Sequence, residues 1–452
     1  MDLIAPLDAL FLLAESREHP MHVGSLQLFE APEDAGPDYL REFRDTLLAD
    51  TTIRPTFGKR PATWLGAPQV AWAFDTEVDL DYHVQRSALP APGGMNQLLD
   101  HASVLHGTLL DRHRPMWELH FIEGLADGRF ALYAKMHHSL VDGVSAQRML
   151  RRTFTTDPFA SEVNRPWNLP RMERRNTVPA SRSRLGRVLD AVTDAGSSTT
   201  ALMKATRTGV LQQQLTLPFE APRTLFNVPI GGARKCAVRT WSLDRVKQVK
   251  KATGATVNDV VLAMSAGALR AYLLERNALP DKPMIAMVPM SLREDDDLDS
   301  QGVKVAALLC NLGTHIADPL ERLRVVSDST ARNKEVYRSL SPAQTLAVAG
   351  VMLSPMAAML LPGFASVATP PFNIVISNVP GSREQMYWNG SRLDATYPLS
   401  IPLDGQAVNI TLTSHGDSLD FGLVGCRRTV PDLHRLLDHL EDSLCALEDA
   451  AL

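Results

Sequence analysis

The stretch from residue 129 to residue 150 constrains the fold and chemistry of this chain more than any other part. Residues 130–136 alternate between two faces, which predicts a β-strand of mixed burial. Residues 144–154 carry apolar side chains at helical spacing, which predicts a helix. Four residues suited to chemistry or to a tight turn lie between the two elements: His137, His138, Asp142 and Gly143. A rigid turn from strand to helix commonly aims functional side chains into a cleft.

These four residues suit attack by a hydroxyl group that is assisted by a base. A neutral imidazole has a pKa near neutrality, so it can take a proton from an alcohol and pass it on. Asp142, four residues after His138, could orient the imidazole or could face away and hold the loop through an arginine. Gly143 would let the backbone turn tightly or adopt a positive φ.

Two other interpretations of the cluster stay open at this point. The histidines could be a core pair beside a surface turn, which is the commoner role of so short a cluster. A metal site is the third option, but adjacent histidines point to different faces and no nearby cysteine or glutamate completes a ligand set. The spacing does not by itself decide between catalysis and structure.

The heptapeptide HHSLVDG at residues 137–143 resembles the HHxxxDG motif of the CoA-dependent acyltransferase superfamily. That superfamily includes chloramphenicol acetyltransferase, condensation domains and the bacterial wax ester synthase/diacylglycerol acyltransferases. Four further stretches match the last family in the expected order: LDALFLLAE at residues 7–15, PMW at 115–117, NDVVLA at 258–263 and SNVPG at 377–381. Together they span nearly the whole chain, which is therefore identified as a member of that family.

The resemblance implies an α/β fold of two chloramphenicol-acetyltransferase-like domains, with the active-site tunnel running between them. A length of 452 residues also favours two domains. We expect an N-terminal domain over residues 1–168, a connection over 169–230 and a C-terminal domain over 231–452. The connection is rich in arginine, serine and proline and is interpreted as a solvated linker; attraction to CoA phosphates or anionic lipid headgroups is the alternative.

For the motif itself, the resemblance implies a role for each residue. His138, the second histidine, is the general base that deprotonates the acceptor hydroxyl. His137 supports the loop, in an auxiliary or a purely structural role. Asp142 is structural and paired with an arginine, for which Arg293 is the candidate. Gly143 is explained by steric space.

Substrate contacts are expected from two stretches in the C-terminal half. Asn258 and Asp259 are candidate substrate-binding residues, and Asn258 could donate to the oxyanion of the tetrahedral intermediate. Helix capping is the alternative, because Thr256 followed by Asp259 predicts a capping arrangement. Ser377 and Asn378, at the end of a predicted strand, could face the tunnel or shape the following turn.

In the N-terminal half, Pro115, Met116 and Trp117 are expected to line the acceptor side in the manner of the family's PLW. Methionine replaces leucine there, a mild departure because methionine also fills apolar gaps. Another departure is Ser382, where the family often has proline after SNVPG.

The activity implied is that of an acyl-CoA:alcohol O-acyltransferase. It would make triacylglycerol from diacylglycerol, wax ester from a long-chain alcohol, or both, with acyl-CoA as donor substrate and without a metal or other cofactor. One alternative is the same fold acting on a carrier-bound acyl donor or on another hydroxyl or amine. The other is a lipid-binding or scaffold protein without catalysis.

Composition and charge bear on partners and location. The apolar fraction of 45% and charged fraction of 21% are those of a soluble globular protein, and a net charge of -5 favours no nucleic-acid partner. Four widely spaced cysteines fit a reducing compartment. The N-terminus carries no basic leader, so we expect a cytoplasmic protein. The resemblance implies peripheral association with the inner membrane or with lipid droplets, and nothing in the sequence determines the oligomeric state.

The stretch between Arg338 and Arg383 carries no charge and is long enough to suggest a membrane span. Pro355 interrupts it, so we expect buried helices that line the acyl tunnel, or an apolar face that rests on a membrane.

Overall fold

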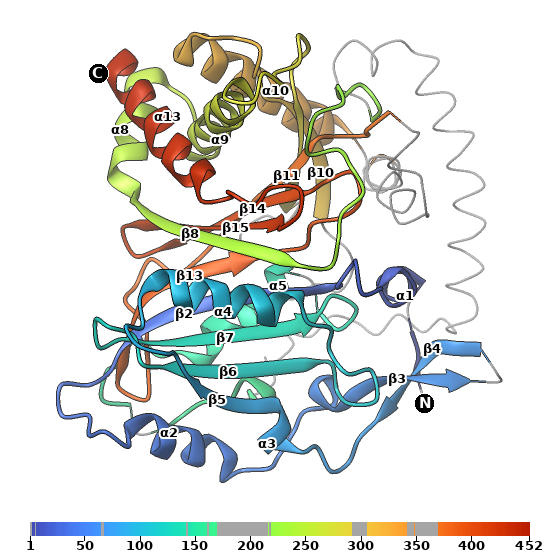
Figure 1. Cartoon of the computed structure of the whole chain (residues 1–452), viewed down its shortest axis with the longest axis vertical. Helices are drawn as coiled ribbons and strands as arrows, with labels where there is room; N and C mark the ends of the chain where they lie inside the picture. Colours follow the sequence, from blue (N-terminus) through green and yellow to red (C-terminus); the bar gives the residue numbers. More distant parts are fainter. Residues whose placement is uncertain are drawn as a thin grey trace.

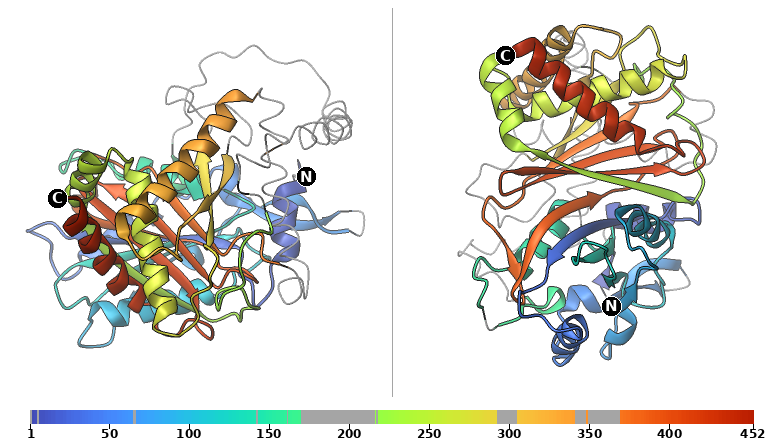
Figure 2. Two further views of the ribbon diagram at one scale, coloured as in Figure 1. Left: turned by 90° about the horizontal axis from the view of Figure 1, so that it is seen from above. Right: turned by 60° about the vertical axis from the view of Figure 1, so that its left-hand side comes forward.

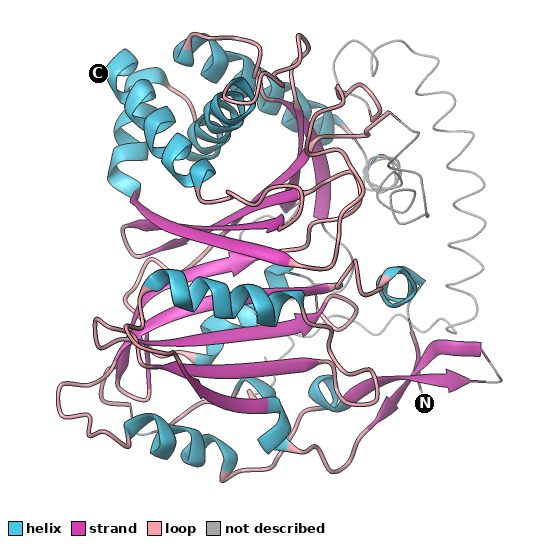
Figure 3. Ribbon diagram, viewed as in Figure 1, coloured by secondary structure: helices cyan, strands magenta, loops and turns pink. Residues whose placement is uncertain are grey.

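The structure is a computed structural model that describes residues 2–4, 6–64, 67–141, 143–160, 162–169, 216, 218–291, 305–340, 348 and 369–452. Two six-stranded sheets form two halves, and helices pack against each sheet (Figures 1 and 3). The predicted α/β class with two units is therefore confirmed.

The N-terminal sheet has the order β12-β13-β2-β7-β6-β5. Its strands are β2 (His22–Glu30), β5 (Val84–Ala88), β6 (Trp117–Glu123), β7 (Phe130–His137), β12 (Tyr387–Trp388) and β13 (Ser391–Leu399). Helices α2 (Tyr39–Leu48) and α4 (Met95–Gly107) cover its opposite faces. Phe130 and Leu132 pack with α2, whereas Ala131 and Tyr133 pack with α4, as the alternation predicts.

Smaller elements surround this sheet. A three-stranded sheet joins β1 (Asp2–Leu3), β4 (Ala67–Phe74) and β3 (Lys59–Trp64). The helices are α1 (Pro6–Ala14), α3 (Leu80–His83), α5 (Gly143–Thr153) and the 3-10 turns Pro55–Gly58 and Pro166–Asn168.

The C-terminal sheet has the order β10-β9-β11-β14-β15-β8. Its strands are β8 (Arg234–Ser242), β9 (Ile285–Ser291), β10 (Val305–Asn311), β11 (Ile374–Val379), β14 (Val408–His415) and β15 (Ser418–Cys426). Helices α8 (Leu243–Thr253), α9 (Val257–Leu274), α10 (Pro319–Ser339) and α13 (Arg435–Ala451) cover the face turned away from the N-terminal half (Figure 2).

Helix α9 is the central helix of this layer. Among the described residues it is the one helix long and apolar enough to cross a membrane by length and composition, yet 72% of it is buried inside the protein. Its neighbour α8 ends at Gly254, which takes a left-handed φ of 74°. We conclude that the apolar character of α9 reflects its place in the core.

Strand β13 joins the two halves. It comes from the C-terminal part of the sequence but pairs along its length with β2. The predicted C-terminal domain, residues 231–452, is therefore interrupted, because residues 387–399 belong to the N-terminal sheet. This exchange was not predicted, since the pairing of distant strands is not encoded in a local pattern.

Two local features fit β13 between the halves. Proline has no backbone N–H to donate to a neighbouring strand. Strand β12 pairs only with the first two residues of β13, so Pro398 near the other end of β13 leaves no hydrogen bond to β12 missing. On the side of β15, a Cβ at Gly422 would lie 2.0 Å from the carbonyl oxygen of Pro398. Any side chain at position 422 would therefore push the two strands apart.

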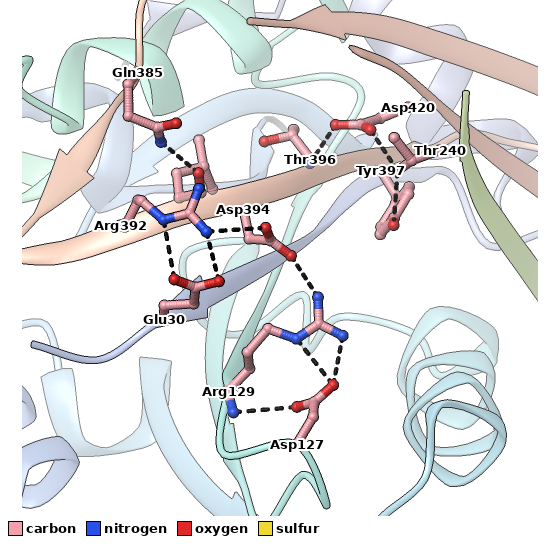
Figure 4. Close-up of polar contacts among 11 residues, drawn as sticks. Glu30, Asp127, Arg129, Thr240, Gln385, Arg392, Asp394, Thr396, Tyr397 and Asp420 are labelled. Atoms are coloured by element: carbon pink, nitrogen blue, oxygen red, sulfur yellow. Dashed lines mark hydrogen bonds and ion pairs between the residues drawn. The ribbon is translucent and has the colours of Figure 1, made fainter. Parts of the chain in front are cut away.

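Ion pairs fasten β13 to the N-terminal sheet (Figure 4). Arg392 pairs with Glu30, which lies opposite it on β2. Asp394 accepts a hydrogen bond from Arg129, and Arg129 also contacts Asp127. These pairs are partly exposed, so we expect each to add only modestly to stability.

A buried carboxyl group fastens β13 to the C-terminal sheet. Asp420 on β15 accepts the backbone N–H of Thr396 at 2.8 Å and the hydroxyl of Thr240 at 2.7 Å (Figure 4). Asp420 is 0% exposed, and this burial raises its pKa to about 7. The junction between the halves thus contains an acid that titrates near neutrality.

Several predictions fall on residues outside the described ranges. These are Asp142, Arg293, the connection over residues 170–215, and residues 341–347 and 349–368 of the uncharged stretch.

Candidate active site

The two histidines lie where β7 ends, between the starts of two neighbouring strands. The backbone N–H of His137 donates to the carbonyl oxygen of Met116 at 3.0 Å. The backbone N–H of His138 donates to the carbonyl oxygen of Met21 at 2.8 Å. Helix α5 begins at Gly143, as the strand-to-helix prediction requires. The backbone that carries both imidazoles is therefore held on both sides.

His137 is a buried side chain with a polar group beside each ring nitrogen. It is 0% exposed, and its Nδ1 accepts the backbone N–H of Ser139 at 3.1 Å. Because Nδ1 is an acceptor, the proton is assigned to Nε2, which faces Glu15 Oε1 at 3.4 Å. The hydroxyl of Ser139 lies 2.7 Å from the same Nδ1. His137 thus links the turn to helix α1.

Glu15 is a buried carboxylate that sequence reasoning did not single out. It accepts the backbone N–H of Met21 at 3.1 Å and the Nε–H of Arg112 at 3.0 Å. Burial alone would raise the Glu15 pKa, but hydrogen bonds and charge from His137, Met21 and Arg112 outweigh it and lower the pKa below its ordinary value. We therefore expect an ionised carboxylate at neutral pH.

The imidazole of His138 is half-buried and lies flat against a phenyl ring. The ring centroids of Phe11 and His138 are 4.2 Å apart, and the planes differ by 17°. Phe11 lies four residues before Glu15, and the backbone N–H of Glu15 donates to the carbonyl oxygen of Phe11. One face of α1 therefore meets both histidines. The four-residue spacing in LDALFLLAE was the available signal.

The predicted partners of this turn can be placed only in part. Asp142 and Arg293 lie outside the described residues, so their pairing stays a prediction.

At the N-terminus of α9, the structure confirms the capping arrangement. The hydroxyl of Thr256 accepts the N–H of Asp259 at 3.2 Å, and the Asp259 carboxylate accepts the Thr256 N–H at 2.9 Å. The other carboxylate oxygen accepts the Thr330 hydroxyl at 2.6 Å, which ties α9 to α10. Asp259 therefore has a structural role. Asn258 lies half-buried in the same turn, and its role as an oxyanion donor stays a prediction.

Ser377 and Asn378 lie within β11, beyond its last pairing with β9. The parallel strands β9 and β11 pair only at Ile374 and Val375, whereas β11 stays paired with β14 through Val379. Both side chains are half-buried in this part of the strand. Carboxyl ends of parallel strands that separate in this way are common sites for ligands. Whether these two residues contact substrate stays a prediction.

The loop after β11 faces helix α5 across a narrow cavity of about 40 Å³. This cavity brings the helix that follows the histidine turn together with the end of the SNVPG stretch. Its polar lining includes Gln27, Gln147, Arg148, Arg151, Ser382, Ser414 and His415.

Pro115, Met116 and Trp117 are buried directly beside the histidine turn. The indole of Trp117 stacks on His83 at 4.4 Å and on Trp167 at 5.6 Å, and its N–H donates to the carbonyl oxygen of Phe57 at 2.9 Å. Trp117 therefore supports the core beneath the turn. That this stretch also lines the acceptor side stays a prediction.

Residues 4–261 match the family described as wax ester synthase/diacylglycerol acyltransferase catalytic domain, and residues 301–448 match its C-terminal domain. A Mycobacterium tuberculosis protein named "Probable diacyglycerol O-acyltransferase" is 55% identical over 100% of this chain and 99% of its own length. A second M. tuberculosis protein, also named a diacylglycerol O-acyltransferase, is 53% identical over 99% of both chains.

Among solved structures, a wax ester synthase/diacylglycerol acyltransferase from Marinobacter aquaeolei VT8 is 40% identical, with a TM-score of 0.80 over 100% of both chains. A condensation domain of the calcium-dependent antibiotic synthetase shares the fold at 16% identity, with a TM-score of 0.63 over 100% of this chain and 96% of its own. These similarities confirm the predicted acyltransferase fold.

Proposed function

The chain belongs to the wax ester synthase/diacylglycerol acyltransferase family and is an O-acyltransferase, and we propose that its donor is a long-chain acyl-CoA and its general base is His138. The acceptor is diacylglycerol, a long-chain alcohol, or both. The observation that carries the assignment of the base is the different state of the two adjacent imidazoles.

The imidazole of His137 is fully buried. Its Nδ1 accepts from Ser139, its Nε2 faces Glu15, and the side chain is 0% exposed. His138 is half-buried, and its backbone is held by Met21. A base must lie within hydrogen-bond reach of the proton that it takes. The difference in burial between the two imidazoles therefore favours His138.

In the proposed reaction, Nε2 or Nδ1 of His138 takes the proton of the acceptor hydroxyl as its oxygen attacks the thioester carbonyl carbon. A tetrahedral intermediate forms, and the C–S bond then breaks. The imidazolium returns its proton to the leaving CoA thiolate, so that the products are an ester and CoA thiol. Atoms and charge balance without an acyl-enzyme, a metal or a redox cofactor.

We place the protein in the cytoplasm, peripherally associated with the inner membrane or with lipid droplets. Both acceptor classes partition into lipid. Three leucines near the N-terminus support an apolar contact surface: Leu3 is 66% exposed, Leu10 is 40% exposed and Leu13 is 68% exposed.

The test is release of CoA thiol from palmitoyl-CoA, with diacylglycerol or hexadecanol supplied separately. We expect acceptor-dependent release by the wild type and a loss of at least about a hundredfold in His138→Ala, because general-base catalysis contributes 10²–10⁴-fold. His113→Ala is the matched control, because its side chain is 96% exposed.

Full activity in His138→Ala would refute the assignment of the base. A folded wild type that turns over only with acyl groups on a carrier protein would refute acyl-CoA as the donor and favour the carrier-dependent alternative.

A further inference from the structure

Helix α1 contributes an aromatic face to the proposed base, and no motif assigns this side chain a role. Phe11 stacks on His138 with ring centroids 4.2 Å apart and an interplanar angle of 17°. At this angle the π face of the phenyl ring, rather than its edge, covers the imidazole. A π face attracts a cation through its quadrupole, and the attraction is larger where water is excluded.

The position of Phe11 is fixed by the residues on either side of its turn. Leu12 is 1% exposed and packs in an apolar cluster with Ile4, Trp72, Leu110 and Met116. One turn later, Glu15 is bonded to Arg112 and to the backbone of Met21. Arg112 also donates to the carbonyl oxygen of Leu12 at 2.8 Å. Core packing of α1 is thus supplied by Leu12, whereas Phe11 is half-buried.

The charged groups beside the turn are engaged with each other. Glu15 faces His137 at 3.4 Å and pairs with Arg112 at 2.9 Å. Helix α1 presents the ring of Phe11 to the ring of His138. Asp8, three residues before Phe11 on the same helix, and His138 each take part in further interactions. When His138 takes the proton from the acceptor, its charge rises from zero to one, and the interaction with the phenyl face strengthens at that moment.

We propose that Phe11 is a positioning residue for the acyl transfer, holding the imidazole of His138 in one plane and stabilising the imidazolium that forms on proton transfer. The inference rests on the proposed function of His138 as general base. It implies that the aromatic face raises the basicity of His138 relative to an aliphatic neighbour.

The test compares Phe11→Leu and Phe11→Trp, measured by thiol release across pH. In Phe11→Leu we expect kcat to fall by roughly fivefold with KM values within about twofold, since a cation–π contact contributes ~0.5–1 kcal/mol or more. The acid limb of the kcat profile should move to lower pH, because the imidazolium loses stabilisation and the pKa of His138 falls. Phe11→Trp should keep the wild-type acid limb. Phe159→Leu is the matched control, because Phe159 is 90% exposed.

A second readout is independent of turnover. Carbethoxylation of His138 at a series of pH values, resolved by peptide mass spectrometry, reports the pKa of its imidazole. We expect a lower pKa in Phe11→Leu than in the wild type. If Phe11→Leu does not fold, Phe11→Met takes its place, since methionine fills the volume without a π face.

The outcomes separate the two hypotheses. An active His138→Ala protein refutes the proposed base. An inactive His138→Ala protein, together with a Phe11→Leu protein whose kcat and acid limb equal those of the wild type, refutes the role of Phe11 alone. A fall in kcat with an unchanged His138 pKa in both readouts also refutes it, because that result indicates packing only.

Discussion

Replacing Glu15 by glutamine should destabilise the protein, because one buried carboxylate holds three groups that are distant in sequence. Its side chain is 1% exposed and accepts from Arg112 and the Met21 backbone while facing His137. A hydrogen bond to a charged group contributes about 1.5–3 kcal/mol, against about 0.5–1.5 kcal/mol for a neutral one. Loss of charge at this site, with Arg112 left partly buried, gives an expected destabilisation of roughly 2–4 kcal/mol.

The assay is urea unfolding at pH 7, with the midpoint and slope fitted separately. Glu18→Gln is the matched control, because Glu18 is exposed in the loop that follows α1. The pH dependence gives a second check. Since the folded pKa of Glu15 lies below its ordinary value of 4.5, its contribution is complete above pH 4.5 and is lost as pH falls through the folded pKa.

The free-energy difference between wild type and Glu15→Gln should therefore be constant near neutrality and shrink in acid. A free energy of unfolding for Glu15→Gln within about 0.5 kcal/mol of that of the Glu18→Gln control would refute the reasoning, since surface substitutions fall within that range. A difference that persists unchanged at pH 3 would show that the carboxylate charge is not its source.

Two further predictions concern the strand exchange. Burial raises the pKa of Asp420 from its ordinary value of 3.8 to about 7, so the free energy of unfolding of the wild type should fall as pH rises through this range. Urea unfolding at pH 5 and pH 8 measures this fall. The Asp420→Asn variant should lack roughly 2–4 kcal/mol of it. Gly422→Ala should destabilise by roughly 2–4 kcal/mol, because its Cβ would lie 2.0 Å from the Pro398 carbonyl oxygen, whereas Gly36→Ala, with nothing within 4 Å, should change little.

What the sequence predicts well is what local signals determine. The capping box at Thr256 is one example, because Thr256 and Asp259 are only three residues apart. The apolar pattern of residues 243–253, followed by Gly254, likewise predicts helix α8 and its end. Each of these elements needs only a pattern within about ten residues of chain.

What was missed depends on contacts between distant parts of the chain. Strand β13 has a partner some 370 positions away in sequence, at β2, and Pro398 within it disfavours a strand by local rules. Glu15 could be recognised as a residue of a family stretch, but not as the partner of His137, because no local pattern states where α1 docks. The pairing of Asp142 with Arg293 stays a prediction.

The two histidines differ in burial because β7 ends at His137, so that His138 lies just outside the strand. By alternation His137 lies on the same face of β7 as Ala131 and Tyr133, and it is buried beside Glu15, the residue that follows α1. His138 is the first residue after the strand, and its backbone N–H is bound to the Met21 carbonyl oxygen. Its ring therefore lies beyond the alternating pattern of the strand and stacks on Phe11.

A shift of one residue in the pairing of β7 with β2 would exchange these environments, because side chains on a strand alternate between faces. The register is fixed by His22 opposite His137 and by six further pairs up to Leu28 opposite Ala131. The two histidines of the motif therefore have different surroundings: His137 faces Glu15, whereas His138 is the residue that we propose as the base. The stacking of α1 on His138 depends on the same contacts, because Glu15, the residue that faces His137, fixes the end of α1.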